Sequence, residues 1–221
     1  DPSDILALIR IAEEAEADLI EIRLDYLTLD PSYASKILED FVEEASVPMI
    51  ATNREYRQGG LKLQDENKRI QLLIQAAGAG FQYVDIELTT AEVKDTVEKI
   101  KSCGSKPIVS FHDFEKTPSF QKMESIVKSE MEVGAEVCKL VTTAHNIEDS
   151  VKCLMLVRKM SRLVKIVCFA MGGKGLLSRM LSPVFGGDFT FASISRAAET
   201  APGQPSIEDL KSLYLKLGVY E

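Results

Sequence analysis

Residues 83–112 read YVDIELTTAEVKDTVEKIKSCGSKPIVSFH, which has the pattern of a strand, a helix and a second strand. The two apolar runs, 83–88 and 107–111, have the length and the Val and Ile content of strands buried on both faces. Between them, 91–102 has apolar residues three and four positions apart, as an amphipathic helix does. We infer that this part of the chain is a βα unit followed by the next strand.

The same alternation extends in both directions along the chain, with a cadence of about 30 residues from strand to strand, as in βα units. The other expected strands are 18–24 (DLIEIRL), 47–52 (VPMIAT), 136–141 (EVCKLV), 163–169 (LVKIVCF) and 189–193 (FTFAS). The other expected helices are 4–17 with Ser3 as N-cap, 32–45 after Asp30-Pro31, 63–77, 119–133, 147–160, a short helix from Leu176, and 207–217.

Strict βα alternation leaves two main architectures, a closed barrel and an open doubly wound sheet. No G-x-G-x-x-G follows an early strand, which disfavours a dinucleotide-binding sheet. A barrel gathers reactive residues at the C-terminal ends of several strands. Glu21, Arg23, Arg54, Glu87, His112 and Lys139 all occupy such positions. We therefore predict an α/β fold, a (β/α)8 TIM barrel, in one domain of residues 1–221.

The strand count is one short of a barrel, because seven strands are expected and eight are needed. The chain opens in a helical pattern, so the first strand is expected to be missing from its N-terminus. The chain is then a truncated or excised piece, or its barrel has a gap where that strand belongs.

Composition narrows the function classes. A net charge of −8 and a pI near 5.0 argue against a general nucleic-acid binder. No apolar run approaches the roughly 20 residues that span a bilayer, and no signal peptide is evident, so we expect a cytoplasmic protein. Four cysteines without a C-x-x-C pair predict buried free thiols rather than disulfides or a metal site. Two histidines, His112 and His145, disfavour a His-rich metal site.

Lys139 lies within the apolar run 137–141, where a lysine is rare. Burial would favour the neutral amine and make it a nucleophile. The structural alternative is a snorkelling or salt-bridged lysine, and Lys165 shows that a strand lysine needs no role. His112 directly follows the strand 107–111, where it can transfer a proton or simply form a cap. We expect His145 to be a surface loop residue.

Three arginines are candidates for binding a carboxylate or phosphate. Arg23 and Arg54 end two early strands, and Arg179 follows a glycine-rich stretch that lacks nucleotide-loop spacing. Salt bridges to neighbouring acids are an equal alternative for each arginine. The turn-rich loop 200–205 is either a mobile lid, with Gln204 touching a substrate, or an ordinary connection.

Taken together, these segments resemble the type I 3-dehydroquinate dehydratase family. The resemblance is carried, in chain order, by Glu21-x-Arg23-x-Asp25, Arg54 with Gly59-Gly60, His112-Asp113-Phe114 with Lys116-Thr117-Pro118, Lys139, Ser178-Arg179 with Phe185-Gly186 and Thr190-Phe191, and Ala201-Pro202-Gly203-Gln204. It covers nearly all of residues 18–217.

The resemblance implies dehydration of 3-dehydroquinate to 3-dehydroshikimate in the shikimate pathway, which leads to aromatic amino acids. Lys139 would form a Schiff base with the ketone, and His112 would act as general base and acid. Arg179 would meet the substrate carboxylate. The hydroxyls would meet Glu21, Arg23, Arg54, Thr200 and Gln204. The resemblance implies no metal or organic cofactor, and the family's habit leads us to expect a homodimer.

The sequence departs from the family at Gln58, where the family has a glutamate before the Gly-Gly pair. An amide can hold the catalytic histidine but cannot stabilise an imidazolium by charge, so we expect a less basic His112. Asp113 or Glu87 would compensate if either lay close enough.

Two alternatives stay open. Another Schiff-base barrel enzyme, such as a class I aldolase, should bind phosphate at its late-strand loops, and no glycine-rich phosphate cradle is evident there. A barrel that has lost activity and serves as a binding or scaffold module is favoured by Gln58 and the missing strand. The presence of Lys139, His112 and Arg179 together weighs against it.

Overall fold

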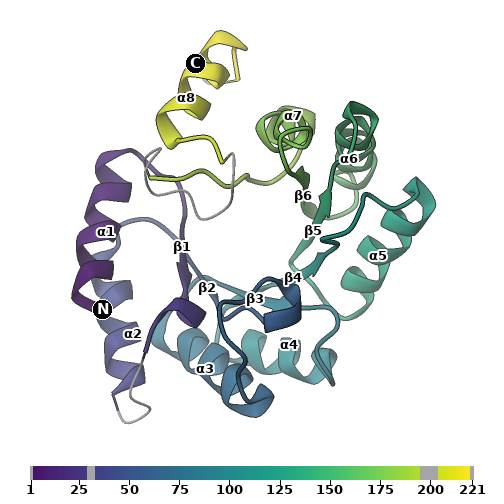
Figure 1. Cartoon of the computed structure of the whole chain (residues 1–221). Helices are drawn as coiled ribbons and strands as arrows, with labels where there is room; N and C mark the ends of the chain where they lie inside the picture. Colours follow the sequence, from purple (N-terminus) through teal and green to yellow (C-terminus); the bar gives the residue numbers. More distant parts are fainter. Residues whose placement is uncertain (1, 29–32, 195–203, 220–221) are drawn as a thin grey trace. The chain divides into compact units, whose positions relative to one another are not determined.

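The computed structural model describes residues 2–28, 33–194 and 204–219. Within them, strands and helices alternate and all strand pairing is parallel (Figure 1). The strands are β1 (Ile20–Arg23), β2 (Met49–Thr52), β3 (Tyr83–Glu87), β4 (Lys106–His112), β5 (Val137–Thr143) and β6 (Lys165–Met171). The helices are α1 (Pro2–Glu14), α2 (Ala34–Glu44), α3 (Glu66–Ala79), α4 (Val93–Ser102), α5 (Phe120–Glu132), α6 (Ile147–Met160), α7 (Leu176–Leu181) and α8 (Ile207–Lys216).

The chain divides into two compact units, Asp1–Ser110 with Glu130–Glu136, and Phe111–Ser129 with Val137–Glu221. In the first unit, β1 pairs with β2, β2 with β3 and β3 with β4. Helices α3 and α4 pack on β2 and β3, and α2 contacts both α1 and α3 (Figure 1). The second unit pairs β5 with β6, and α6 and α7 pack on β6.

Most strand residues are buried, as continuous apolar runs predict, although two of the four residues of β1 are only partly buried. Every residue of β2 is buried, and in β5 only the last residue is partly exposed. In the second unit the core joins Leu140 and Val167 of the strands to Leu154 and Val157 of α6. Their short length and their Val and Ile content are what distinguish such runs from buried helices in the sequence.

Helix ends follow the capping residues. Asp65, Asn146 and Ser206 each accept a backbone N–H bond at the start of α3, α6 and α8, as N-cap residues do. The prediction of Ser3 as an N-cap is wrong, because α1 already includes Pro2. Helix α3 begins at Glu66 rather than at residue 63, because Asp65 supplies the cap. The predicted cap Asp30-Pro31 lies outside the described residues.

The expected strand 189–193 is wrong. In that segment only Ser193 makes a β-bridge, a single parallel one to Ser206. The alternating aromatic pattern has a different cause: Phe189 and Phe191 pack edge to face at 5.6 Å, and Phe191 meets Phe169 at 6.2 Å. The aromatic residues of this segment thus pack ring against ring without a strand ladder.

Of the four cysteines, Cys138, Cys153 and Cys168 are buried and Cys103 is exposed, all as free thiols. The predicted burial is confirmed for the three that lie in apolar segments. Within the described ranges, no helix combines the length and apolar character that a bilayer crossing demands. The same residues contain no group of three or more His, Cys, Asp or Glu that could hold a metal ion.

Candidate active site

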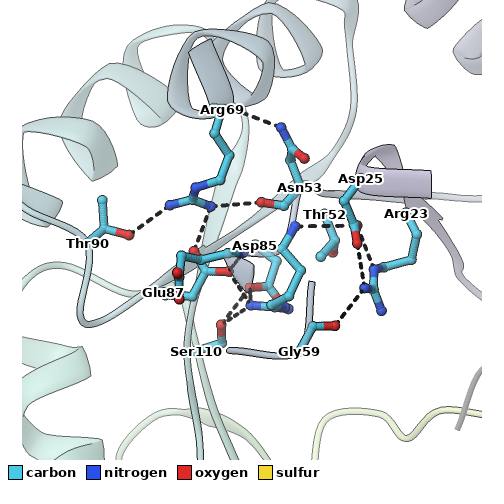
Figure 2. A network of polar contacts seen from close by, with 12 residues as sticks. Arg23, Asp25, Thr52, Asn53, Gly59, Arg69, Asp85, Glu87, Thr90 and Ser110 are labelled. Carbon is cyan, nitrogen blue, oxygen red and sulfur yellow. Dashed lines mark hydrogen bonds and ion pairs between the residues drawn. The ribbon is translucent and has the colours of Figure 1, made fainter. Parts of the chain in front are cut away.

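Arg54 follows β2 and is buried to 3% exposure. Its guanidinium forms a two-pronged ion pair with Asp85, with Nη1–Oδ1 and Nη2–Oδ2 distances of 2.8 and 2.7 Å. Nη1 also lies 2.9 Å from Glu87 Oε1 and 2.7 Å from Ser110 Oγ. Figure 2 shows Asp85, Glu87 and Ser110 gathered in one polar network. Burial opposes the charge on Arg54, but Asp85 and Glu87 outweigh it and raise its pKa.

A second buried arginine, Arg69 on α3, lies beside Arg54 and was not singled out from the sequence. It bonds Glu87 Oε2 at 2.7 Å through Nη1, so the two oxygens of Glu87 join two arginines. Glu66 accepts from Arg69 Nε and Nη2, both at 2.8 Å. The only sequence signal for Arg69 is its place on the buried face of α3, in line with Leu73.

Arg23 ends β1 and pairs with the fully buried Asp25, at 2.8 Å from Nε and 2.7 Å from Nη2. Asp25 also accepts from the backbone N–H of Leu61 at 3.0 Å. Burial works against the charge of Asp25, but Arg23 and the backbone amides outweigh it and lower its pKa. Glu21, two residues before Arg23, accepts a bond from Thr52 Oγ1 at 2.7 Å. Arg23 thus forms the kind of salt bridge that was the alternative to substrate binding.

The Gly59-Gly60 pair lets the following loop approach Arg54. A Cβ on Gly60 would lie 2.1 Å from the backbone O of Arg54, a clash that no side-chain movement can relieve. Arg23 Nη2 donates to the carbonyl of Gly59 at 3.2 Å. Close packing therefore requires a glycine at position 60, and the φ of 90° favours one at position 59. Gln58, just before it, is half-buried at the end of a short 3-10 turn.

In the second unit, Lys139 lies in the middle of β5 and is 4% exposed. Its Cα is registered with Val167 of β6, and its Nζ lies 4.3 Å from the centre of the Phe191 ring. The predicted burial is confirmed. The amine of Lys139 therefore lies against an aromatic face inside the second unit.

Arg179, on α7, is 7% exposed and lies over the Phe169 ring at 4.0 Å. Among the described residues, no carboxylate forms an ion pair with it, and burial alone lowers its pKa to about 10. Phe169 meets Phe191 edge to face, so Arg179 and Lys139 lie over two rings of one aromatic cluster. A buried cation without an anion is suited to receive one.

The position of α7 depends on Gly175 and Ser178. Ser178 Oγ accepts from the backbone N–H of Ala170 at 2.9 Å and donates to the carbonyl of Gly175 at 2.7 Å. A Cβ on Gly175 would lie 2.1 Å from the carbonyl O of Ala170. These contacts tie the turn before Arg179 to the end of β6.

His112 is the last residue of β4, and its ring stacks on Phe114 with centroids 6.0 Å apart. The next residue, Asp113, donates its backbone N–H to Val141 O of β5 at 2.8 Å, while its Oδ1 accepts two amides of its own turn. Asp113 and Glu87 are the two carboxylates expected to compensate for Gln58. Asp113 is bonded by its own turn, and Glu87 is bonded by Arg54 and Arg69. His145 is exposed, as predicted.

Lys139, His112 and Arg179 belong to the second unit, where Phe169 and Phe191 link Lys139 and Arg179, and Glu21, Arg23 and Arg54 belong to the first. Gln204 is 6% exposed and precedes Pro205, whose carbonyl accepts the N–H of Ser193 at 2.9 Å. Thr200 lies outside the described residues. Three further residues contact the predicted ones and had no role predicted from the sequence. Arg69 and Asp85 lie in the network around Arg54, and Phe169 lies under Arg179.

Comparison with known proteins gives three findings. The model of a family described as type I 3-dehydroquinase matches residues 1–221. The chain is 36% identical over 205 residues to the chloroplastic bifunctional 3-dehydroquinate dehydratase/shikimate dehydrogenase of Arabidopsis thaliana, covering 92% of this chain and 33% of that protein. It is 35% identical over 198 residues to the 3-dehydroquinate dehydratase of Dehalococcoides mccartyi, covering 90% and 85% of the two chains.

Among solved structures, the chain is similar to the 3-dehydroquinate dehydratase of Geobacillus kaustophilus HTA426, with a TM-score of 0.93 and 25% identity. The match covers 100% of this chain and 88% of that one. It confirms the predicted α/β class, a fold of the TIM-barrel type, with six parallel strands among the residues described here.

Proposed function

The chain belongs to the type I 3-dehydroquinase family, and from this premise we propose that it dehydrates 3-dehydroquinate to 3-dehydroshikimate. This is a hydro-lyase reaction of the shikimate pathway. Relatives named 3-dehydroquinate dehydratase, similar over most of their length, support the proposal. A small-molecule substrate also agrees with a net charge of −8, which disfavours nucleic acid.

The observation that carries the proposal is that the Lys139 amine and the Arg179 guanidinium are both buried over one aromatic cluster. Burying a guanidinium without a carboxylate disfavours the folded state. A substrate carboxylate bound to Arg179 would offset that cost through charge-assisted hydrogen bonds. Lys139 in the same unit supplies the nucleophile for a ketone.

In the proposed reaction, Lys139 Nζ attacks the ketone and one water leaves, which gives an iminium. The iminium withdraws electrons and acidifies the adjacent C–H. His112 takes that proton and returns it to the departing hydroxyl, so that a second water leaves. Water then hydrolyses the product iminium and restores Lys139. The net change is loss of one water.

The remaining roles belong to the same proposal. Glu21, Arg23, Arg54, Thr200 and Gln204 would bind the substrate hydroxyls, in one catalytic domain of residues 1–221. Arg54 and Arg23 are already paired with carboxylates, so each would offer substrate only its remaining donors. With Gln58 in place of a glutamate, we propose a less basic His112. A cytoplasmic homodimer remains a prediction.

The test is to incubate the protein with 3-dehydroquinate, reduce with borohydride and map the adduct by peptide mass spectrometry. Borohydride fixes an imine to its lysine. We expect the adduct on Lys139 in the parent and in Lys165→Ala, which removes an exposed strand lysine, and no adduct in Lys139→Ala. A folded parent that gives no adduct would refute the mechanism and favour a scaffold.

A further inference from the structure

Arg69 has every side-chain donor engaged. An arginine carries five N–H donors, and the structure supplies five acceptors. Nη1 bonds Glu87 Oε2 and the carbonyl of Asn53, both at 2.7 Å. Nη2 bonds Glu66 Oε1 and Nε bonds Glu66 Oε2, both at 2.8 Å. Nη2 also bonds Thr90 Oγ1 at 3.1 Å (Figure 2). Arg69 therefore has no donor left for a ligand.

The acceptors of Arg69 adjoin Arg54 on both its backbone and its side chain. Asn53 is the preceding residue, and its amide Nδ2 donates back to the carbonyl of Arg69 at 3.3 Å. Glu87 holds Arg54 Nη1 with one oxygen and Arg69 with the other. Glu87 Oε1 also accepts the backbone N–H of Glu55 at 3.1 Å. Arg69 is thus linked to the residues on either side of Arg54.

Arg54 differs from Arg69 in its donor count. Asp85, Glu87 and Ser110 take both donors of Nη1 and one of Nη2. Among the described residues, no acceptor bonds Nε or the second donor of Nη2. Two donors of a guanidinium held rigidly on its other edge can bind a hydroxyl or carbonyl oxygen with little loss of entropy.

Charge balance gives Arg69 a second purpose. Asp85 and Glu87 are both at most 1% exposed, and Arg54 alone would leave one buried negative charge uncompensated. Arg69 supplies the second positive charge from α3. Without it, Glu87 would draw the Arg54 guanidinium toward itself, away from its symmetric pair with Asp85.

We propose that Arg69 is a positioning residue of the reaction. Through Glu87 and Asn53 it fixes the two unoccupied donors of Arg54 where they meet the substrate. This inference rests on the proposed dehydration, in which Arg54 contacts a substrate oxygen.

The experiment is a double-mutant cycle of Arg69→Lys with Arg54→Lys, measured as kcat/KM for 3-dehydroquinate. Lysine keeps the charge but cannot hold Glu87, Asn53 and Glu66 together. Misplacement by about 1 Å can lower a rate about 100-fold. We therefore expect Arg69→Lys alone to lower kcat/KM by about 10- to 100-fold, mainly by raising KM, while borohydride still traps substrate on Lys139.

In the Arg54→Lys background we expect Arg69→Lys to lower kcat/KM by less than about threefold, because coupled residues are non-additive. Arg10→Lys is the control: it loosens a two-pronged pair with Glu44 on an exposed part of the same unit and should leave kcat/KM unchanged. Melting temperatures establish that each variant is folded at the assay temperature.

If Arg69→Lys does not fold, Glu66→Gln loosens the outer end of Arg69 and should show a smaller, equally non-additive effect. Suppose the parent traps substrate, but Arg69→Lys leaves kcat/KM unchanged, or lowers it equally with and without Arg54→Lys. Either result overturns the role of Arg69 and leaves the proposed function standing. A folded parent that traps no substrate overturns both.

Discussion

The buried arginines differ in how many of their guanidinium N–H donors remain without an acceptor. Arg69 uses all of its side-chain donors, and Arg54 has two left. Arg23 bonds through Nε and Nη2 only, so its Nη1 is open among the described residues. For Arg179 no side-chain hydrogen bond occurs within the described part of the chain, although its own carbonyl accepts from Thr190 at 2.8 Å. The number of open donors indicates how directly each arginine can meet a substrate.

Replacing Arg179 should change stability and activity in opposite directions. Burial lowers its pKa from 12.5 to about 10, and each pKa unit corresponds to about 1.4 kcal/mol. The folded state therefore bears a cost on the order of 3 kcal/mol. We expect Arg179→Met to raise the free energy of unfolding by about 1–3 kcal/mol. The same change should lower kcat/KM by about 30- to 1000-fold, since a charged partner is lost.

Urea unfolding and steady-state kinetics measure both effects. Arg162→Met, at an exposed position of the second unit, is the matched control and should change neither. A less stable Arg179→Met protein with parental kinetics would show that Arg179 is a structural ion.

Two glycines of the first unit should respond to alanine in opposite directions. A Cβ at Gly60 would lie 2.1 Å from the backbone of Arg54, whereas one at Gly78 in α3 meets nothing within 4 Å. We expect Gly60→Ala to destabilise the protein by about 2 kcal/mol or more and to lower activity through Arg54. Gly78→Ala should stabilise it by about 0.5–1 kcal/mol through helix propensity alone. Thermal unfolding of the pair tests this, and equal shifts would contradict it.

At the scale of elements, the apolar pattern of the sequence predicted the helices and strands whose position depends on local burial. Helix α6 has the predicted bounds, and six of the expected strands are found within two residues of their predicted starts. The prediction of a strand at 189–193 was wrong because the alternating aromatic residues pack ring against ring there without a ladder. Lys139 was predicted from its setting in a buried run. The ion network around Glu87 was not, because its partners come from distant positions in the chain.

The N-cap of α6 should contribute to stability without touching the reaction. Asn146 Oδ1 accepts from the backbone N–H of Asp149 at 3.0 Å. Loss of such a cap costs about 1 kcal/mol. We expect Asn146→Ala to lower the free energy of unfolding by that amount with kcat/KM unchanged. Asn67→Ala, an exposed asparagine within α3 that is not a cap, should be close to neutral. Chemical unfolding of both proteins checks the difference.

For the whole molecule, the proposed residues fall in both compact units. Lys139, His112 and Arg179 belong to the second, and Glu21, Arg23 and Arg54 belong to the first. Neither unit contains the full set of proposed residues. The single domain expected from the sequence stays a prediction.

Acid should destabilise the molecule through its paired carboxylates. Asp25 is fully buried and bonded to Arg23, and its pKa lies below the ordinary 3.8. A carboxyl group with a lowered folded-state pKa stabilises fully above its unfolded pKa. That stabilisation is lost as the pH falls through the lowered folded value. We expect Asp25→Asn to be less stable than the parent at pH 7.

The difference between Asp25→Asn and the parent should close as the pH falls below about 3.8. Exposed carboxyls with lowered pKa, such as Glu13 and Glu124, titrate in both proteins, so they cancel in the comparison. Urea unfolding at a series of pH values from 7 downward gives the difference directly. A gap that stays constant through this range would mean that Asp25 stabilises the fold by its shape and hydrogen bonds rather than by its charge.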